Sequence, residues 1–287
     1  MSRSLSLSRT ARPAVLVPIL VLLAALLTGA TQSSRAGAAV AAGDTAAKPT
    51  VVLVHGAFAD SSGWNDVITR LAAKGYPVLA PPNPLRGLTS DTAYLKTFLS
   101  TIAGPIVLVG HSYGGAVITN AATGNPDVRA LVYVAAYALD EGENVAEANE
   151  LGGGHSDLLE HIIVRPYPGA PEGDGDVYVD PQAFRSIFAQ DLPRDQTVAM
   201  AAGQRPATFG ALITPSAEPA WRTVPSWYLI AGDDNLIPPL AQAAMAERAE
   251  ARTRTVDSSH VAMMSHPRAT TEMILQAAYA TTRNHRP

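Results

Sequence analysis

The sequence predicts an α/β domain built on one doubly wound, mostly parallel sheet. Short runs of β-branched and other apolar residues alternate with longer segments of helical pattern, which is typical of parallel strands joined by right-handed crossovers. Polar or glycine-containing loops follow several of these runs, at the edge where open α/β sheets bind ligands. The chain has 287 residues, 47% of them hydrophobic, which is enough to bury one large core.

The expected elements follow from apolar runs bounded by glycine or proline and from breaker-free segments between them. Strands are expected near 50–55, 76–80, 105–110, 129–136, 226–231 and 252–256. Helices are expected near 63–73, 90–102, 113–123, 239–250 and 267–282. Residues 141–222 lack this rhythm, and an interval of roughly 80 residues is too long for a plain loop. We therefore expect a cap inserted there.

The first 41 residues have the composition of a secretory signal peptide. Arginines precede an apolar run at 13–27, and small residues at 36–42 suit cleavage near residue 39 or 42. Residues 42–287 would then form the mature domain, while an uncleaved anchor helix is the alternative. The chain has no cysteine, so neither lipidation nor a disulfide is expected. We expect a secreted protein with no stable membrane partner once the signal is cleaved.

The first expected strand runs into His55-Gly56-Ala57-Phe58. Gly56 lets the backbone approach a neighbouring segment closely, and we expect His55 to hydrogen-bond the loop backbone. The N–H of Ala57 is then a candidate donor to a negatively charged oxygen at the carboxyl edge of the sheet.

The third expected strand leads into Gly110-His111-Ser112-Tyr113-Gly114, and no helix breaker follows until Gly124. A strand that turns sharply into a helix leaves no room for side chains beside the turn residue, which explains the flanking glycines. The pattern is typical of a nucleophile elbow with Ser112 at the turn. The N–H groups of Tyr113 and Ala57 would form the two donors that an oxyanion needs.

A serine hydroxyl needs a base and an orienting acid to become nucleophilic, and the chain offers both downstream. The strand near 252–256 is followed by a loop that ends in His260, the candidate base. The strand near 226–231 is followed by Asp233 and Asp234, and the residues alone do not separate these two carboxylates. Asp140 is a third candidate acid.

These motifs resemble those of the α/β-hydrolase fold superfamily, in its single-domain esterase and hydroxynitrile-lyase-like branch, over about residues 50–282. The resemblance rests on His55-Gly56, the elbow, Asp234 ahead of Ile237-Pro238, and Ser259-His260. It implies that Asp234 is the acid. It also implies an α/β-hydrolase fold with a helical cap, at about 141–222, inserted after the sixth strand.

Hydroxynitrile lyases of this branch need a lysine after the catalytic histidine and a hydroxyl residue in the first oxyanion loop. Val261 and Gly56 stand at these positions here, so the resemblance favours hydrolysis over cyanohydrin cleavage.

The expected cap has two parts. The first part is rich in glycines and prolines, which predicts a mobile segment, whereas the apolar spacing of the second part predicts an amphipathic helix. A cap over an elbow shapes the substrate pocket, although most of its apolar side chains are expected to be cap core. The candidate pocket residues are all aromatic: Phe58, Phe188, Phe209 and Trp221.

Together these residues predict a serine hydrolase that cleaves small-molecule carboxylic esters through an acyl-enzyme. A net charge of −4 does not provide the positive charge that binding to nucleic acid needs, so we expect no nucleic-acid partner. The sequence has no phosphate-binding loop or zinc-spaced ligand cluster, so we expect no cofactor and no metal. The alternatives are a cofactor-free lyase or haloperoxidase-like activity on the same triad, and a non-catalytic binding protein with this fold.

Overall fold

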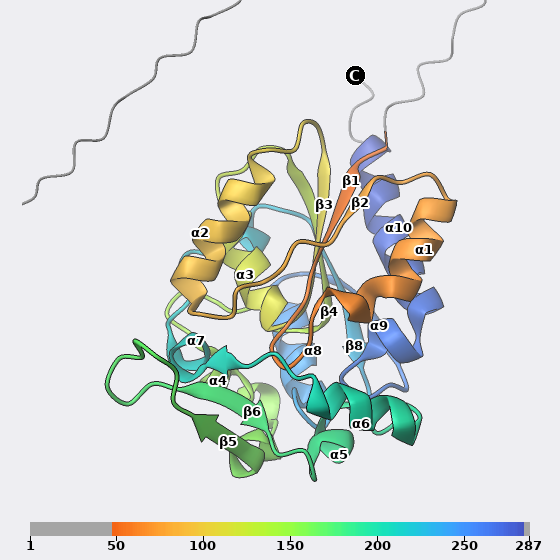
Figure 1. Ribbon diagram of the computed structural model, residues 1–287. Coiled ribbons are helices and arrows are strands. Elements are labelled where there is room, and N and C mark those ends of the chain that lie inside the picture. Colours follow the sequence, from red (N-terminus) through yellow and green to blue (C-terminus); the bar gives the residue numbers. More distant parts are fainter. Residues whose placement is uncertain (1–47, 284–287) are drawn as a thin grey trace, which may run out of the picture. The chain divides into compact units, whose positions relative to one another are not determined.

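The computed structural model describes residues 48–283, and the predicted signal peptide lies outside them. A six-stranded sheet with the order β2-β1-β3-β4-β8-β9 forms the centre (Figure 1). Every strand pair in it is parallel. The strands are β1 (Thr50–Val54), β2 (Val78–Leu79), β3 (Ile106–Ser112), β4 (Val128–Ala136), β8 (Ser226–Ala231) and β9 (Arg252–Val256). The predicted α/β-hydrolase fold is confirmed, and the strands lie close to the expected ranges.

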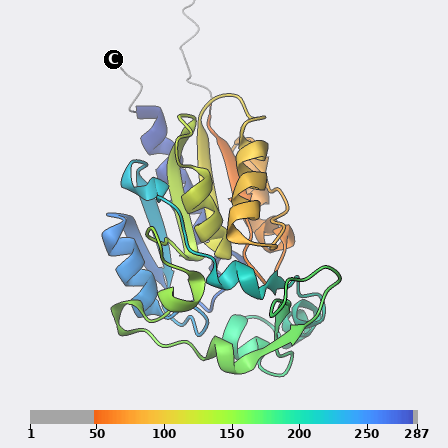
Figure 2. The same ribbon diagram turned by 90° about the vertical axis from the view of Figure 1, so that its left-hand side faces the viewer.

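Helices cover both faces of this sheet (Figures 1 and 2). The helices α1 (Asn65–Ala73) and α10 (Pro267–Arg283) pack together on one face, where α10 contacts β3, β4 and β8. The helices α2 (Leu88–Leu99), α3 (Tyr113–Ala121) and α8 (Pro239–Arg248) lie on the other face. The short helices η1 (Ser61–Trp64) and α9 (Ala262–Ser265) follow the carboxyl ends of β1 and β9.

The central strands are mostly apolar because helices cover them on both sides. All residues of β3 and β8 are buried, whereas the edge strand β9 is exposed at four of its five positions. This burial fixes the carboxyl ends of β1, β3 and β8, from which the candidate functional loops extend.

The cap connects β4 to β8 and lies across the carboxyl ends of the strands (Figure 1). It therefore follows the fourth strand of this chain, not the sixth. Its helical segments are α4 (Val145–Ala148), η2 (Leu151–Gly153), η3 (Asp157–His161), α5 (Phe184–Phe188), α6 (Arg194–Ala202), α7 (Phe209–Ile213) and η4 (Ala220–Arg222).

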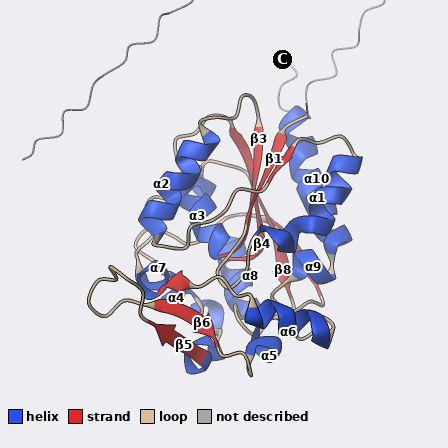
Figure 3. Ribbon diagram, viewed as in Figure 1, coloured by secondary structure: helices blue, strands red, loops and turns tan. Residues whose placement is uncertain are grey.

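The cap also contains β structure that the sequence analysis did not predict. The strands β5 (Ile162–Arg165), β6 (Asp176–Val179) and β7 (Ala207–Thr208) form a second, antiparallel sheet (Figure 3). The breaker-rich first part of the expected cap contains β5, whose β-branched residues pair with those of β6 across the loop 166–175. Within residues 48–283, no helix has the length and apolar character needed to cross a bilayer.

Candidate active site

Ser112 lies at a sharp turn between β3 and α3. Its backbone has φ 53° and ψ −128°, a conformation that is strained for a residue with a Cβ. Ser112 is only 3% exposed, so the turn faces the interior below the cap and not open solvent. Strain of this kind persists only where the surrounding packing holds the backbone in place.

Close backbone contacts supply that packing. A Cβ on Gly114 would lie 2.5 Å from the carbonyl oxygen of Val54, and one on Gly110 would lie 2.7 Å from the carbonyl oxygen of Gly114. A Cβ on Gly56 would lie 2.5 Å from the Cβ of Ser112. The loop after β1 is therefore pressed directly against the elbow, which is why these positions need glycine.

Two backbone N–H groups at this contact lack an acceptor within residues 48–283. They belong to Ala57, in the loop after β1, and to Tyr113, the first residue of α3. The neighbouring N–H of Phe58 is occupied, since it donates to the carbonyl oxygen of Arg205 at 2.8 Å. The geometry therefore leaves the N–H groups of Ala57 and Tyr113 available for an oxygen bound at Ser112.

The side chains of His260 and Asp234 form a fully buried pair. Nδ1 of His260 donates to Oδ2 of Asp234 at 2.8 Å, and both side chains have no exposed surface. Because Nδ1 carries the donated proton, Nε2 of the neutral ring is an acceptor. It is buried without a hydrogen-bond partner in the described part of the chain.

Asp234 is held by three further hydrogen bonds. Its Oδ1 accepts from the N–H groups of Leu236 at 2.8 Å and Ile237 at 3.0 Å, and its Oδ2 accepts from Nε2 of Gln242 at 2.8 Å. The other two candidate acids have other partners: Asp140 pairs with Arg222, and Asp233 is bonded through its backbone, donating its N–H to Ser258 and accepting from Gln190 at its carbonyl oxygen. Of the three, the structure places Asp234 against His260.

No hydrogen bond among the described residues joins Oγ of Ser112 to Nε2 of His260. Contacts of this kind are often long in unliganded enzymes and tighten when substrate binds.

His111 precedes the elbow serine and contacts the candidate base. Its Nε2–H donates to the carbonyl oxygen of His260 at 2.9 Å, and the two ring centroids are 4.7 Å apart. Complete burial, together with the nearby His260, holds the pKa of His111 well below its usual value. This neutral ring links β3 to the loop of His260.

His55 has the backbone role predicted for it. Its Nδ1–H donates to the carbonyl oxygen of Gly56 at 2.9 Å, and its Nε2 accepts from the N–H of Asn83 at 2.9 Å. Burial lowers the pKa of His55, so the ring remains neutral and keeps both hydrogen bonds.

A buried carboxylate that the sequence analysis missed supports Tyr113. Oδ2 of Asp91 accepts from the phenol of Tyr113 at 2.8 Å, and Oδ1 accepts from the N–H of Arg86 at 3.1 Å. Burial and the Asp91 carboxylate raise the pKa of Tyr113, which keeps the phenol protonated as the donor. Asp91 lies in α2, a separate helix, and only the folded structure reveals this pairing.

The four predicted pocket aromatics fall into two groups. Phe188 in α5 packs its ring edge-on against His260, with centroids 5.1 Å apart, and Phe58 lies 6.3 Å from Phe188. Trp221 instead donates its indole N–H to the carbonyl oxygen of Leu139 at 2.9 Å. Phe209 begins α7 and is half-buried against the core. Neither Trp221 nor Phe209 pairs its ring with that of Phe58 or Phe188. The structure therefore brings Phe58 and Phe188 to the site, but not Trp221 or Phe209.

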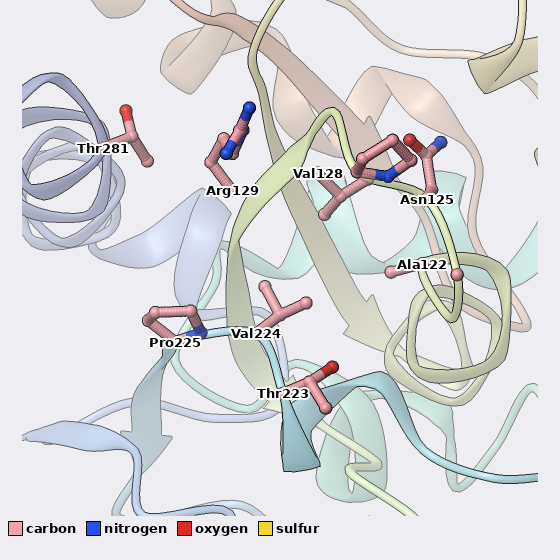
Figure 4. Close-up of a pocket in the computed structure, with 10 residues that line it drawn as sticks. Ala122, Asn125, Val128, Arg129, Thr223, Val224, Pro225 and Thr281 are labelled. Carbon is pink, nitrogen blue, oxygen red and sulfur yellow. The ribbon is translucent and has the colours of Figure 1, made fainter. Parts of the chain in front are cut away.

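Two cavities differ in their relation to this site. A groove of about 270 Å³ runs beside the loop after β1, between Phe58, Met200 of α6 and Met264 of α9. A second cavity, of about 460 Å³, is drawn in Figure 4. It lies where β4 and β8 begin, beside Arg129 and Pro225, at the opposite edge of the sheet from Ser112. Only the first cavity adjoins the candidate site.

Comparisons with known proteins agree with this architecture. The alpha/beta hydrolase family matches residues 51–273. An alpha/beta hydrolase from Aspergillus novofumigatus is 25% identical over 257 residues, which cover 80% of this chain and 97% of that protein. A carbendazim hydrolyzing esterase from Nocardioides is 31% identical over 143 residues, which cover 41% of this chain and 59% of that protein.

The fold has a similar solved structure. A pyrethroid hydrolase from Sphingobium faniae superposes with a TM-score of 0.67 at 24% identity, covering 82% of this chain and 99% of that one. The family match runs from β1 into α10 and so includes the elbow, the cap and both downstream loops. The chain therefore belongs to the alpha/beta hydrolase family and is an esterase-like member of it.

Proposed function

We propose that this protein is a serine hydrolase that cleaves carboxylic esters, with Ser112 as nucleophile, His260 as base and Asp234 as the orienting acid. The buried 2.8 Å bond between His260 and Asp234, beside a strained elbow serine, is the observation that carries the proposal. One relative that covers part of the chain is named an esterase, which agrees with this reaction class.

The first half of the reaction forms an acyl-enzyme. Nε2 of His260 takes the proton from Oγ of Ser112 as the oxygen attacks the ester carbonyl carbon. The N–H groups of Ala57 and Tyr113 hold the negative oxygen of the tetrahedral intermediate. His260 then gives its proton to the departing alcohol, and the acyl group remains on Ser112.

The second half releases the acid. His260 removes a proton from water as the water attacks the acyl carbon. The new intermediate then collapses to the free carboxylic acid as His260 returns that proton to Oγ of Ser112. In both halves Asp234 stabilises the imidazolium that forms on His260. Its four hydrogen bonds, to His260, Leu236, Ile237 and Gln242, hold it oriented for this role.

The surroundings favour an apolar substrate. Phe188 and Phe58 line the approach to His260, and the adjoining groove is walled by Met200 and Met264. Aromatic and thioether side chains bind apolar groups by area and shape. Small or medium apolar esters are therefore the substrate class that we propose.

Labelling with a fluorophosphonate and hydrolysis of p-nitrophenyl esters of increasing acyl length test the proposal. Wild type is expected to react in both assays, because its serine is activated. Ser112→Ala and His260→Ala should each lower kcat by a factor on the order of 10⁴ or more, and Ser112→Ala should not be labelled. Ser90→Ala, at an exposed serine of α2, is the matched control and should behave as wild type.

Other outcomes point to other functions. A wild type that is neither labelled nor hydrolytic would identify a binding protein on this fold. Turnover of a cyanohydrin or of peroxide without ester hydrolysis would identify the lyase or haloperoxidase-like activity. Equal activity in Ser112→Ala and wild type would show that Ser112 is not the nucleophile.

We also propose that residues 1–41 direct export, since their arginines and apolar run suit a signal peptide. Expression of the full chain, beside a chain that begins at residue 42, tests this by immunoblot of the cell and export fractions. Equal cytoplasmic retention of both would overturn it.

A further inference from the structure

One short cap segment, residues 186–191, touches both loops that carry the acid and the base. It begins within α5 and ends before α6, so it belongs to the cap and not to the sheet. The two loops follow β8 and β9, which pair as neighbours. A single segment can therefore reach both.

Asp191 makes the contact with the loop of His260. Its carboxylate accepts from the backbone N–H of Ser259 at 3.0 Å and from the Ser259 hydroxyl at 2.5 Å. Ser259 is completely buried and immediately precedes His260. Burial acts to raise the pKa of Asp191, but its hydrogen bonds together, first those from Ser259 and then that from Ser265, outweigh burial and lower the pKa. Asp191 is therefore an ionised acceptor fixed on the residue next to the base.

The same segment contacts the loop of Asp234 on both sides of that residue. The carbonyl oxygen of Ser186 accepts from Nδ2 of Asn235 at 2.8 Å, and the side-chain amide of Gln190 donates to the carbonyl oxygen of Asp233. These contacts flank Asp234 in the sequence, as Ser259 adjoins His260.

Between these polar contacts, the ring of Phe188 packs against His260, the proposed base. Its ring lies edge-on to the imidazole of His260, 5.1 Å between centroids, and stacks on Phe184 within α5. The segment thus fixes the loop of the base, the loop of the acid, and one side of the imidazole ring.

We propose that residues 186–191 form a positioning segment: by packing against the loops of Asp234 and His260, this part of the cap holds the acid and the base together. Asp191 is its principal positioning residue. This inference rests on the proposed function and adds a dependence of the triad on the cap. Asp191 acts through Ser259: without that acceptor, two buried donors lose their partner and the loop of His260 is free to shift away from Asp234.

A matched pair of cap carboxylates tests the inference. Asp174, like Asp191, accepts several hydrogen bonds: from Gly175 at 2.8 Å, Gly210 at 3.0 Å and Tyr167 at 3.1 Å, all within the cap. Asp191→Ala is expected to lower kcat for p-nitrophenyl acetate by about 10- to 100-fold with a smaller change in KM. Asp174→Ala is expected to lower the melting temperature of the protein and leave kcat within a few-fold of wild type.

A conservative variant separates positioning from general damage. Asp191→Asn keeps an acceptor oxygen for Ser259 and should recover much of the lost kcat. Ser259→Ala combined with Asp191→Ala should cost less than the sum of the single losses, because the two residues act through one contact. Equal kcat in Asp191→Ala and Asp174→Ala, measured well below both melting temperatures, would overturn the inference.

A measurement without substrate keeps this test independent of the ester reaction. The Nδ1 proton of His260 should give a low-field proton NMR signal that is absent from His260→Ala. Asp191→Ala should shift or broaden that signal, and Asp174→Ala should leave it in place. If wild type does not hydrolyse esters, only the proposed function is refuted. If the Nδ1 proton signal is unchanged in Asp191→Ala, only the positioning role is refuted.

Discussion

The elbow and the acid–base loops are held by different forces. At the elbow, main-chain atoms of β1, β3 and α3 meet so closely that Gly110 and Gly114 cannot carry a Cβ. The loops of Asp234 and His260 are instead held by side-chain hydrogen bonds, from Gln242, His111 and the cap residue Asp191. Backbone packing therefore places the nucleophile, while side chains that are distant in sequence place the groups that activate it.

The largest effect is expected from a methyl group at the elbow. In Gly114→Ala the new Cβ would lie 2.5 Å from the carbonyl oxygen of Val54 and 2.8 Å from that of His55, so β1 or the elbow must shift. We expect a loss of about 3 kcal/mol or more in the free energy of unfolding, together with loss of hydrolysis. Urea unfolding and fluorophosphonate labelling measure the two effects.

Gly203→Ala is the control for that substitution, because its nearest contact, the carbonyl oxygen of Ala199, is at an ordinary 3.4 Å. Similar stabilities of the two variants would show that close backbone contact does not hold the elbow.

A smaller loss of stability with a clear loss of activity is expected at the acid loop. Gln242 donates to Asp234 and to the carbonyl oxygen of Ile237, and accepts from the N–H of Ala231 at 3.0 Å. Gln242→Leu removes these bonds and buries the Ala231 N–H without a partner, which costs about 1–3 kcal/mol. We expect kcat to fall by about 10- to 100-fold, as for other residues that orient a functional group.

Urea unfolding and ester kinetics of Gln242→Leu decide this point, with the exposed Gln276→Leu as control. If Gln242→Leu loses stability but keeps the kcat of wild type, side-chain bonds do not set the position of the acid.

The smallest effect is a pH dependence of stability that arises from His55 and His111, two of the buried histidines. Burial holds the pKa of His111 well below, and that of His55 below, the usual value near 6.5. Below that pH the unfolded chain therefore binds protons that the folded protein does not, and stability is lost as the pH falls. Each such histidine contributes a slope of at most about 1.4 kcal/mol per pH unit.

Urea unfolding at pH 5.5 and 7.5 measures this slope. His111→Gln should reduce it, because glutamine does not titrate, whereas the exposed His161→Gln should leave it as in wild type. An unchanged slope in His111→Gln would show that His111 takes up a proton in the folded state.

The same contrast explains what the sequence predicted. The elbow and the buried strands are local patterns of a few residues, so the fold and the region around Ser112 could be predicted in detail. The pairing of Asp91 with Tyr113 spans 22 residues, and that of Asp191 with Ser259 spans 68, with no local sequence signal for either. Such residues become visible only when the chain has folded.

The cap was harder to predict than the sheet. Its short strands β5 and β6 are separated by a loop rich in glycine and proline, and those breakers concealed the β-branched pairs on either side. Composition alone gave no reason to prefer Phe188 over Trp221 beside His260, since both are large aromatics of the same insertion.

Ser112 is 3% exposed and His260 is fully buried beneath Phe188. In the proposed acyl-enzyme, this burial limits the access of water to the acyl carbon. The burial that encloses the proposed nucleophile thus also bears on turnover, because the release of the acyl group would depend on how readily water enters beneath the cap.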